Sequence, residues 1–340
     1  MRRLPIIFFA ATVALGCLSA AGSPASPAAG ALKIVKRIDG PDGGWDYASF
    51  DAARRRVYIS HGNVVLALDV ATDRLDPKFA VGDGLHAIVP IPASGELVTT
   101  NSGDSSVRII KASDGSLVSS LPVDADADGA VYDPMTKLVV VVNGDPGVLT
   151  LVDVARRKVV GTIKVGDKLE FLAVDGKGRA YVDVVSTGEV AVVDLVHRKA
   201  IGRYAMAGCK YPTGIAYVAG ARLVAACGAG GAKVLDATTG KEIASFKTGG
   251  FPDAVIYDPV RRLAMIPTAL DGKLTVISLS GKTDNKVIAT IPTQLGARLG
   301  AVDPRTGRVY LPTAQYNALV PGKRPTTKPG TFQILVLDRE

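Results

Sequence analysis

The sequence is poor in the side chains that most often carry enzyme chemistry, because its 340 residues include three histidines, three cysteines and one tryptophan. It contains no GxSxG, HExxH or CxxCH segment and no glycine-rich phosphate loop. No motif therefore points to the chemistry of GxSxG serine hydrolases, HExxH zinc proteases, c-type haem proteins or P-loop nucleotide hydrolases. No stretch of useful length has the 3.6-residue periodicity of an amphipathic helix, so helical folds are excluded.

Long apolar runs are also missing, except at the N-terminus. There, Arg2 and Arg3 precede an apolar run over residues 6–18 that is too short to span a bilayer, and small residues follow it. We therefore expect residues 1–21 to be a cleaved signal peptide and residues 22–30 to be a disordered tether. The protein is then periplasmic or secreted, without a transmembrane segment, and we expect a monomer.

The few cysteines fit an exported protein. Cys209 and Cys227 form an even pair, and in an oxidising compartment we expect a disulfide between them. Two buried thiols are the alternative. The third cysteine ends the segment Ala14-Leu15-Gly16-Cys17, which resembles a lipoprotein box, so a lipid anchor through Cys17 is an alternative to full release.

What the sequence does have is repetition. An alternating apolar strand recurs seven times and ends at Asp69, Lys111, Asp153, Asp194, Asp236, Ser278 and Asp338. The first five intervals between these anchors are 41 or 42 residues long, and the sixth is 60. A period of about 42 residues is typical of a propeller blade with four short strands.

The two ends of the chain are expected to share one blade. The last copy ends at Glu340 without an outer strand, whereas residues 32–38 have the character of an outer strand with no inner strands before it. Their pairing would remove the exposed edge of an open ring. The sequence therefore predicts an all-β fold, a seven-bladed β-propeller over residues 31–340 with four-stranded antiparallel blades, in which the N-terminal strand closes the last blade.

The long final interval contains an insertion at residues 314–331 of the last blade. Its prolines, glycines and three basic side chains predict an irregular loop. A mobile insertion and a flap over the channel mouth are the two interpretations.

Several segments are similar to those of a known family: GGWDY at 43–47, the EFxxxDGKG run at 170–178, CxxPTG at 209–214, LDxxTGK at 235–241, PDA at 252–254 and PTQxGAR at 292–298. The sequence resembles the YVTN-repeat, YncE-like propellers over residues 31–340. This resemblance implies an exported propeller, and single-stranded DNA binding has been claimed for YncE itself. The sequence departs from these relatives at Asp183, where Asn is common.

The equivalent position in each copy of the repeat, at the entrance of the innermost strand, is occupied by a polar residue: Asp46, His86, Asp128, Glu170, Thr213, Asp253 and Arg298. Innermost strands line the channel of a propeller, so we expect these side chains to form a ring at one mouth. Crowded carboxylates raise one another's pKa or recruit a cation. A solvated channel without a ligand is the competing interpretation.

Neighbouring loops are expected to add His61, Asn101, Asn143, Thr268 and Tyr316 around the same mouth. Trp45 is either a wedge between blades or a stacking platform. The predicted ligand-binding set is therefore Trp45, Asp46, His86, Asn101, Asp128, Asn143, Glu170, Thr213, Asp253, Arg298 and Tyr316.

Three classes of function remain. We favour a module that binds a small polar or cationic ligand, or a protein partner, at the channel mouth. The alternative is a lyase, lactonase or other hydrolase in which His61 or His86 is the base, Glu170 an acid or metal ligand, and Arg298 stabilises an anionic transition state. No cofactor is evident, although His61 and His86, with Glu170 or Asp46, could hold a divalent metal.

Nucleic-acid binding is the third class. It would need basic residues interleaved with aromatics along a groove, whereas aromatics are few here and the predicted ring is acidic. The formal net charge of +8 is not gathered in runs. The dipeptide Lys210-Tyr211 and the basic insertion are the features that favour it.

Overall fold

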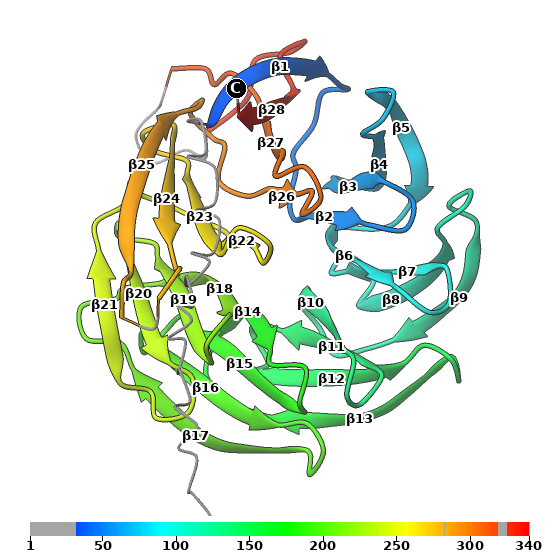
Figure 1. Cartoon of the computed structure of the whole chain (residues 1–340). Coiled ribbons are helices and arrows are strands. Elements are labelled where there is room, and N and C mark those ends of the chain that lie inside the picture. The colour runs from blue at the N-terminus through cyan, green and yellow to red at the C-terminus, as the bar shows by residue number, and fades with distance from the viewer. Residues whose placement is uncertain (1–31, 282, 319–324, 340) are drawn as a thin grey trace, which may run out of the picture. The chain divides into compact units, whose positions relative to one another are not determined.

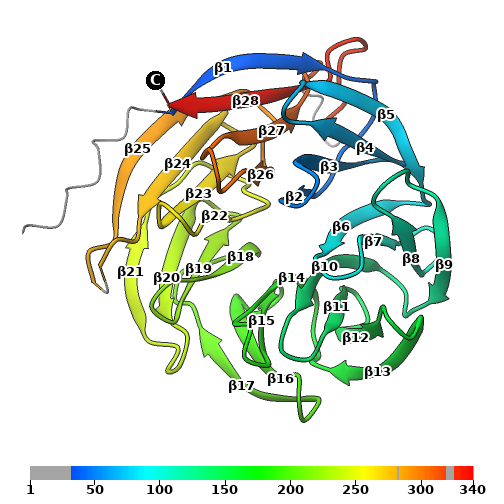
Figure 2. The ribbon, with the colours of Figure 1, turned by 45° about the vertical axis from the view of Figure 1, so that its right-hand side comes forward.

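The computed structural model describes residues 32–281, 283–318 and 325–339. In this part of the chain, 28 β-strands form seven four-stranded antiparallel sheets. The sheets are arranged in a ring around a common axis (Figure 1), and the same ring is seen when the molecule is turned (Figure 2). The predicted all-β, seven-bladed propeller is confirmed.

Each blade runs from an innermost strand A to an outer strand D. The first three blades comprise β2 (Ala48–Asp51), β3 (Arg56–His61), β4 (Val64–Asp69) and β5 (Arg74–Val81); β6 (Leu85–Ile91), β7 (Glu96–Asn101), β8 (Ser106–Lys111) and β9 (Leu117–Pro122); and β10 (Ala127–Asp133), β11 (Leu138–Asn143), β12 (Val148–Asp153) and β13 (Lys158–Lys164).

The remaining blades repeat this order. They comprise β14 (Leu169–Val174), β15 (Arg179–Val184), β16 (Glu189–Asp194) and β17 (Lys199–Ala205); β18 (Pro212–Val218), β19 (Arg222–Cys227), β20 (Gly231–Asp236) and β21 (Glu242–Phe246); β22 (Ile256–Asp258), β23 (Leu263–Thr268), β24 (Lys273–Ser278) and β25 (Lys286–Pro292); and β26 (Ala301–Val302), β27 (Val309–Thr313), β28 (Gln333–Arg339) and β1 (Leu32–Asp39).

Burial explains why the strands differ in composition. Strand β11 is buried along its whole length because sheets cover both of its faces, which suits its run of valines. Strand β17 lies at the outside of its blade and is largely exposed. The hydrophobic core therefore lies between neighbouring blades and fills the space around the channel.

The repeated Asp at the end of strand C has a local structural role. Asp69 Oδ1 accepts the backbone N–H groups of Ala71 and Thr72, both at 3.0 Å. Asp236 accepts those of Thr238 and Thr239 in the same way. Such turns satisfy backbone donors where the ladder ends, which accounts for the repeated Asp in the sequence.

The N-terminal strand closes the ring as predicted. Strand β1 pairs antiparallel with β28 from Leu32, opposite Arg339, to Asp39, opposite Gln333. This pairing gives the seventh blade its fourth strand and leaves no exposed edge on β28.

The predicted disulfide is present. Cys209 and Cys227 are bonded, and their Cα atoms are 5.2 Å apart. The bridge joins the loop that precedes β18 to the end of β19, where Pro212 pairs with Cys227.

Other predictions concern residues that are only partly described. The signal peptide, the tether and the lipid anchor at Cys17 lie outside the described residues. The insertion lies between β27 and β28 and is described except at 319–324; Tyr316 forms a bridge with Thr327 inside it. Within the described ranges, no helix is long and apolar enough to cross a membrane.

Candidate functional site

Six of the seven predicted entrance residues form a group, linked by contacts or by charge, that we call the acidic ring: Asp46, His86, Asp128, Glu170, Asp253 and Arg298. Its centre is His86, whose Nδ1 lies 2.5 Å from Asp46 Oδ2 and 3.4 Å from Asp128 Oδ1. The three side chains come from consecutive blades and are each partly exposed, by 29%, 23% and 17%. The repeat phase therefore predicted a real spatial cluster.

His86 is held as a cation by its neighbours. Burial opposes the charged imidazolium, but the hydrogen bond and charge of Asp46, with the charge of Asp128, outweigh burial and raise the pKa of His86 to about 9. The other ring nitrogen, Nε2, lies 2.9 Å from Ser102 Oγ. Ser102, which follows strand β7 in the B to C connection, is not among the residues predicted from the sequence.

The other side of the acidic ring is organised by Arg298. Its Nε donates to Asp253 Oδ2 at 2.6 Å, and its Nη2 donates to the carbonyl oxygen of Trp45 at 3.2 Å. Burial raises the pKa of Asp253 to about 6, although Arg298 acts to lower it. One cation thus holds the entrances of the first, sixth and seventh blades together.

Two further carboxyls of the acidic ring, those of Glu170 and Asp128, have raised pKa values. Burial, together with the charges of Asp128 and Asp253, raises the pKa of Glu170 to about 9. Burial and Asp46 raise the pKa of Asp128 to about 7. Near neutral pH the ring therefore holds protons that a bound cation would replace.

Hydroxyl groups brace the ring from the preceding blade. Ser60 Oγ donates to the carbonyl oxygen of His86 at 2.5 Å, and Thr100 Oγ1 donates to that of Asp128 at 2.6 Å. In the fourth blade the same position, next to last in strand B, is occupied by Asp183. Its carboxyl is fully buried without a hydrogen-bond partner among the described residues, and burial raises its pKa well above the usual range.

Four predicted residues use their polar groups elsewhere. Thr213 Oγ1 donates to the carbonyl oxygen of Pro252 at 2.6 Å, so the fifth blade adds no side chain to the ring contacts. Asn101, Asn143 and Thr268 are fully buried, and each bonds within or next to its own B to C loop. They stabilise loops instead of lining the mouth, because the last residue of strand B points into the loop.

His61 is also a packing residue. It is 5% exposed, its ring meets Phe332 edge-on at 4.6 Å, and burial lowers its pKa. The predicted metal ligands His61, His86 and Glu170 are therefore not brought together, whereas His86 does lie with the alternative ligand Asp46. In the described chain, one group of His, Cys, Asp or Glu has its atoms within 4.8 Å of one another, namely Asp46, His86 and Asp128. There, hydrogen bonds already occupy both nitrogens of His86.

Trp45 packs as a wedge between the first and last blades. It is 6% exposed and packs on Phe332 at 5.5 Å and on Tyr316 at 6.5 Å between ring centroids. The Arg298 guanidinium lies 5.9 Å from its ring centroid. Trp45 thus joins the first and last blades next to the acidic ring, and its buried position leaves no open stacking surface.

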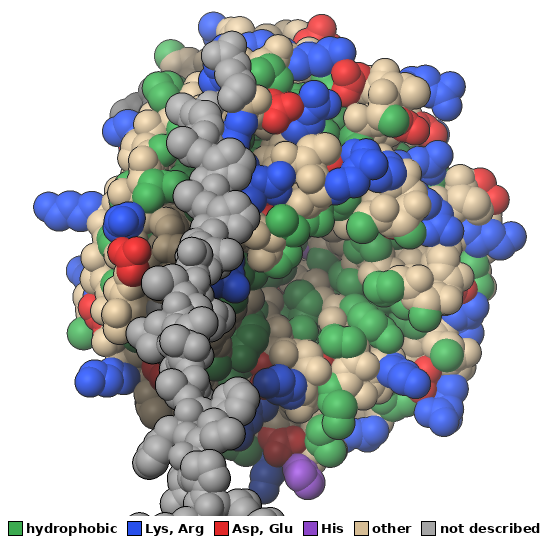
Figure 3. Space-filling model, viewed as in Figure 1, with side chains coloured by type: hydrophobic (Ala, Val, Ile, Leu, Met, Phe, Trp, Pro, Cys, Tyr) green, Lys and Arg blue, Asp and Glu red, His purple; other side chains and the backbone are tan. Residues whose placement is uncertain are grey.

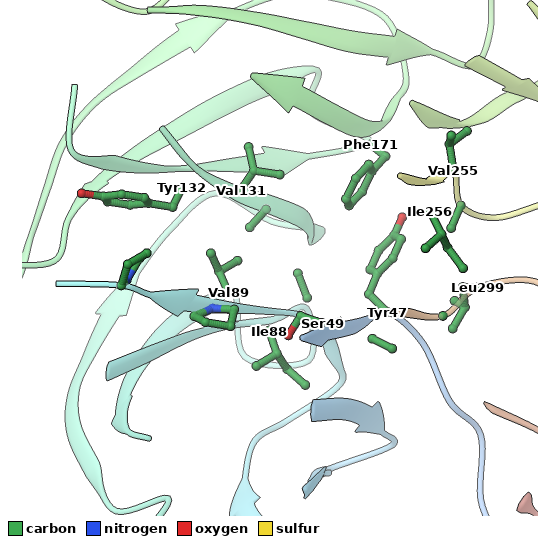
Figure 4. Close-up of a pocket in the computed structure, with 17 residues that line it drawn as sticks. Tyr47, Ser49, Ile88, Val89, Val131, Tyr132, Phe171, Val255, Ile256 and Leu299 are labelled. Atoms are coloured by element: carbon green, nitrogen blue, oxygen red, sulfur yellow. The ribbon is translucent and has the colours of Figure 1, made fainter. Parts of the chain in front are cut away.

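An apolar chamber of about 420 Å³ lies along the A strands just past the ring residues. Figure 4 shows its lining, which includes Tyr47, Val89, Val131, Phe171, Ile256 and Leu299. On the face seen in Figure 3 the centre of the molecule is hollowed and lined by hydrophobic side chains. The channel therefore has a charged part and an apolar part.

Tyr47 and Phe171, which the sequence analysis did not select, stand where the two parts meet. Their rings are 4.8 Å apart. Burial raises the pKa of Tyr47, and so do the charges of Asp128 and Asp253. The sequence could have indicated both residues, since Tyr47 directly follows Asp46 and Phe171 directly follows Glu170.

Comparisons with known proteins identify the fold alone. No protein-family model and no curated protein matches the chain. Solved structures that resemble it include U3-55K, with 10% identity, a TM-score of 0.75 and coverage of 89% of this chain and 98% of that one. The WD40 repeats of RRP9 match with 10% identity, a TM-score of 0.75 and coverage of 91% and 99%.

The hydrazine synthase of Kuenenia stuttgartiensis also matches, with 15% identity, a TM-score of 0.69 and coverage of 86% of this chain and 96% of that one. Identities this low carry no argument about ligand or activity. The matches include WD40 repeats, and the likeness supports the β-propeller fold.

Proposed function

We propose that the protein binds a small organic cation at the acidic ring. The observation that carries this proposal is the set of three carboxyls with raised pKa values, Asp128, Glu170 and Asp253, around one channel mouth. Glu170 has no hydrogen bond or ion pair to another described residue. An ammonium group could displace its proton and gain a partly buried ionic contact.

The direct test is titration calorimetry of the purified mature protein with a primary ammonium, a quaternary ammonium and a divalent metal ion. We expect the ammonium ions to bind and Glu170→Gln to weaken them at least tenfold at pH 8. Glu242→Gln on outer strand β21, which removes a partner of Lys233, is the matched control and should bind as the natural protein does. Binding of the metal alone, or equal binding by both variants, would contradict the proposal.

A second candidate, docking of a protein partner, is favoured by an exposed apolar crescent beside the ring. Its members are Tyr211, Phe251, Leu270 and Leu295, with exposed fractions of 62%, 54%, 69% and 53%. Backbone hydrogen bonds link their loops in sequence around the fifth to seventh blades. We propose that such a partner covers the crescent with apolar side chains and extends a basic side chain into the acidic ring.

The conformation of the crescent supports a functional role. Tyr211 and Phe251 have left-handed backbone angles, with φ of 54° and 58°. In the loops that precede β10 and β14, the residues with left-handed angles are Asp126 and Asp167, and Asp tolerates this conformation well. A strained backbone that exposes a large aromatic ring does not serve folding, so it is typical of a contact surface.

We also propose that the chain is an exported YncE-like propeller. The disulfide between Cys209 and Cys227 is consistent with an oxidising compartment. The mass of the protein recovered from an expressing bacterium tests this: a chain that begins near residue 22 supports a cleaved leader, and lipid mass on Cys17 supports an anchor. A full-length chain in the cytoplasm would contradict export.

A further inference from the structure

A hydroxyl, an imidazole and a carboxylate stand in series at the channel mouth. Ser102 Oγ is 2.9 Å from His86 Nε2, and His86 Nδ1 is 2.5 Å from Asp46 Oδ2. The three residues are far apart in sequence and come from the B to C connection of blade 2, from strand β6 and from the entrance of blade 1. Their order is that of a serine nucleophile, its base and the group that orients the base.

We propose that Ser102 is a nucleophile activated by His86, that Asp46 positions His86, and that the site cleaves carboxylic esters whose other half carries a cationic group. The preference for a cationic ester rests on the proposed function of the acidic ring. The nucleophile itself rests on the geometry of the three side chains alone.

The surroundings leave room for a reaction at Ser102. Its side chain is half-buried, and the His86 side chain is 29% exposed. Gly84 lies against the hydroxyl: a Cβ at this position would stand 2.9 Å from Ser102 Oγ, and its φ of 59° favours glycine in addition. A glycine therefore permits the close approach of this loop to Ser102, whose hydroxyl also donates to the Gly84 carbonyl oxygen at 3.3 Å.

The reaction balances with water as the second substrate. Ser102 Oγ bonds to the ester carbonyl carbon while its proton passes to His86 Nε2. The carbon–oxygen bond to the alcohol then breaks, and that proton goes to the departing alkoxide. Water repeats the sequence on the acyl-serine, losing its proton to His86 and releasing the carboxylic acid and Ser102.

The charges that face His86 set the pH at which it can act. These are Asp46 from the blade 1 entrance and Asp128 on β10, with Asp126 before that strand, and together they raise the pKa of His86 to about 9. Because His86 must be neutral to accept the Ser102 proton, the rate should rise with pH and level off above about 9. Removing the Asp128 charge should move this rise to lower pH.

A fluorophosphonate probe tests the nucleophile without any assumption about the substrate. We expect labelling of Ser102, located by peptide mass spectrometry, that is lost in Ser102→Ala and kept in Ser94→Ala, a serine in the A to B turn of the same blade. His86→Gln should slow labelling by about 10²- to 10⁴-fold. Asp128→Asn, which leaves Ser102 and His86 in place, should move the midpoint of the pH profile below 9.

Hydrolysis of two 4-nitrophenyl esters, one neutral and one with a quaternary ammonium, separates the two proposals. Faster turnover of the cationic ester, lost in Glu170→Gln, supports both. Labelling and turnover without that preference support the nucleophile and contradict the cation site. Absence of labelling at Ser102, or labelling that does not depend on His86 or pH, overturns the nucleophile even if ammonium ions bind.

Discussion

Gly330 donates its backbone N–H to the carboxylate of Asp42, at 2.8 Å to each oxygen, across 288 positions of the chain. Next to this contact, Gly40 N donates to the carbonyl oxygen of Phe332 at 3.1 Å. The two ends of the propeller are therefore joined beyond the ladder of β1 and β28. Closure of the ring depends on residues that are adjacent only after folding.

Deletion of residues 32–39 should open the ring and sharply lower the unfolding temperature, since it removes strand β1 and exposes the edge of β28. Thermal unfolding and light scattering measure the loss and the resulting association. The control is Lys36→Ala, which removes one exposed ion pair with Asp73 and should cost less than about 1 kcal/mol. An unchanged melting temperature in the deletion would contradict closure by β1.

Replacing both disulfide cysteines, Cys209 and Cys227, with serine should lower the free energy of unfolding by about 3 kcal/mol, because the bridge closes a loop of 18 residues. Denaturant titration measures the difference. Reduction of the natural protein should reproduce it and add two mass units, and the denatured, unreduced chain should show no thiol at these positions. Two reactive thiols there would rule the bridge out.

Asp183→Asn should stabilise the protein increasingly as pH rises. Burial raises the folded-state pKa of Asp183 above its unfolded value, so its contribution to stability is full below about pH 4 and is lost as pH rises toward the folded pKa. The amide stays neutral, and a gain of about 1 kcal/mol or more is expected at pH 8. Denaturant unfolding of both proteins at pH 4.5 and pH 8 measures this. If the difference in unfolding free energy between them is the same at both pH values, the pKa of Asp183 is not raised by folding.

Binding of an ammonium ion should tighten from pH 6 to pH 9 with release of protons. The raised pKa values of Asp128, about 7, and Glu170, about 9, mean that the empty ring holds protons over this range and the occupied ring does not. Calorimetry in buffers of different ionisation enthalpy counts the protons. Glu170→Gln should remove the part of the rise above pH 7, and a pH-independent affinity would argue against proton displacement.

Replacing Tyr211 or Phe251 with glycine should leave stability unchanged or raise it by up to about 1 kcal/mol, because glycine adopts their left-handed conformation without strain. The same variants should abolish enrichment of peptides that combine basic and apolar residues when the protein is panned against a random peptide library. A loss of more than 2 kcal/mol in either variant would show that the aromatic ring serves folding instead.

Much of the fold followed from the order of residues alone. The 42-residue period and the Asp found near the end of strand C in five blades are local features, because six of the seven blades are each built from one continuous segment and their turns need particular residues. The missing outer strand of the last copy likewise identified β1 as its completion. The repeat phase also brought Asp46, His86 and Asp128 to one mouth, since equivalent positions in a ring of blades face the same axis.

The tertiary structure alone decided which loop side chains join that site. His61 and His86 both lie near the ring face by sequence, yet His61 packs on Phe332 and His86 meets Asp46. Asn101 and Ser102 are neighbours, but the amide bonds within its loop and the hydroxyl turns to His86. A strand's alternation ends where the loop begins, and beyond that point the direction of a side chain depends on turn angles and on contacts from the adjacent blade, which no repeat pattern encodes.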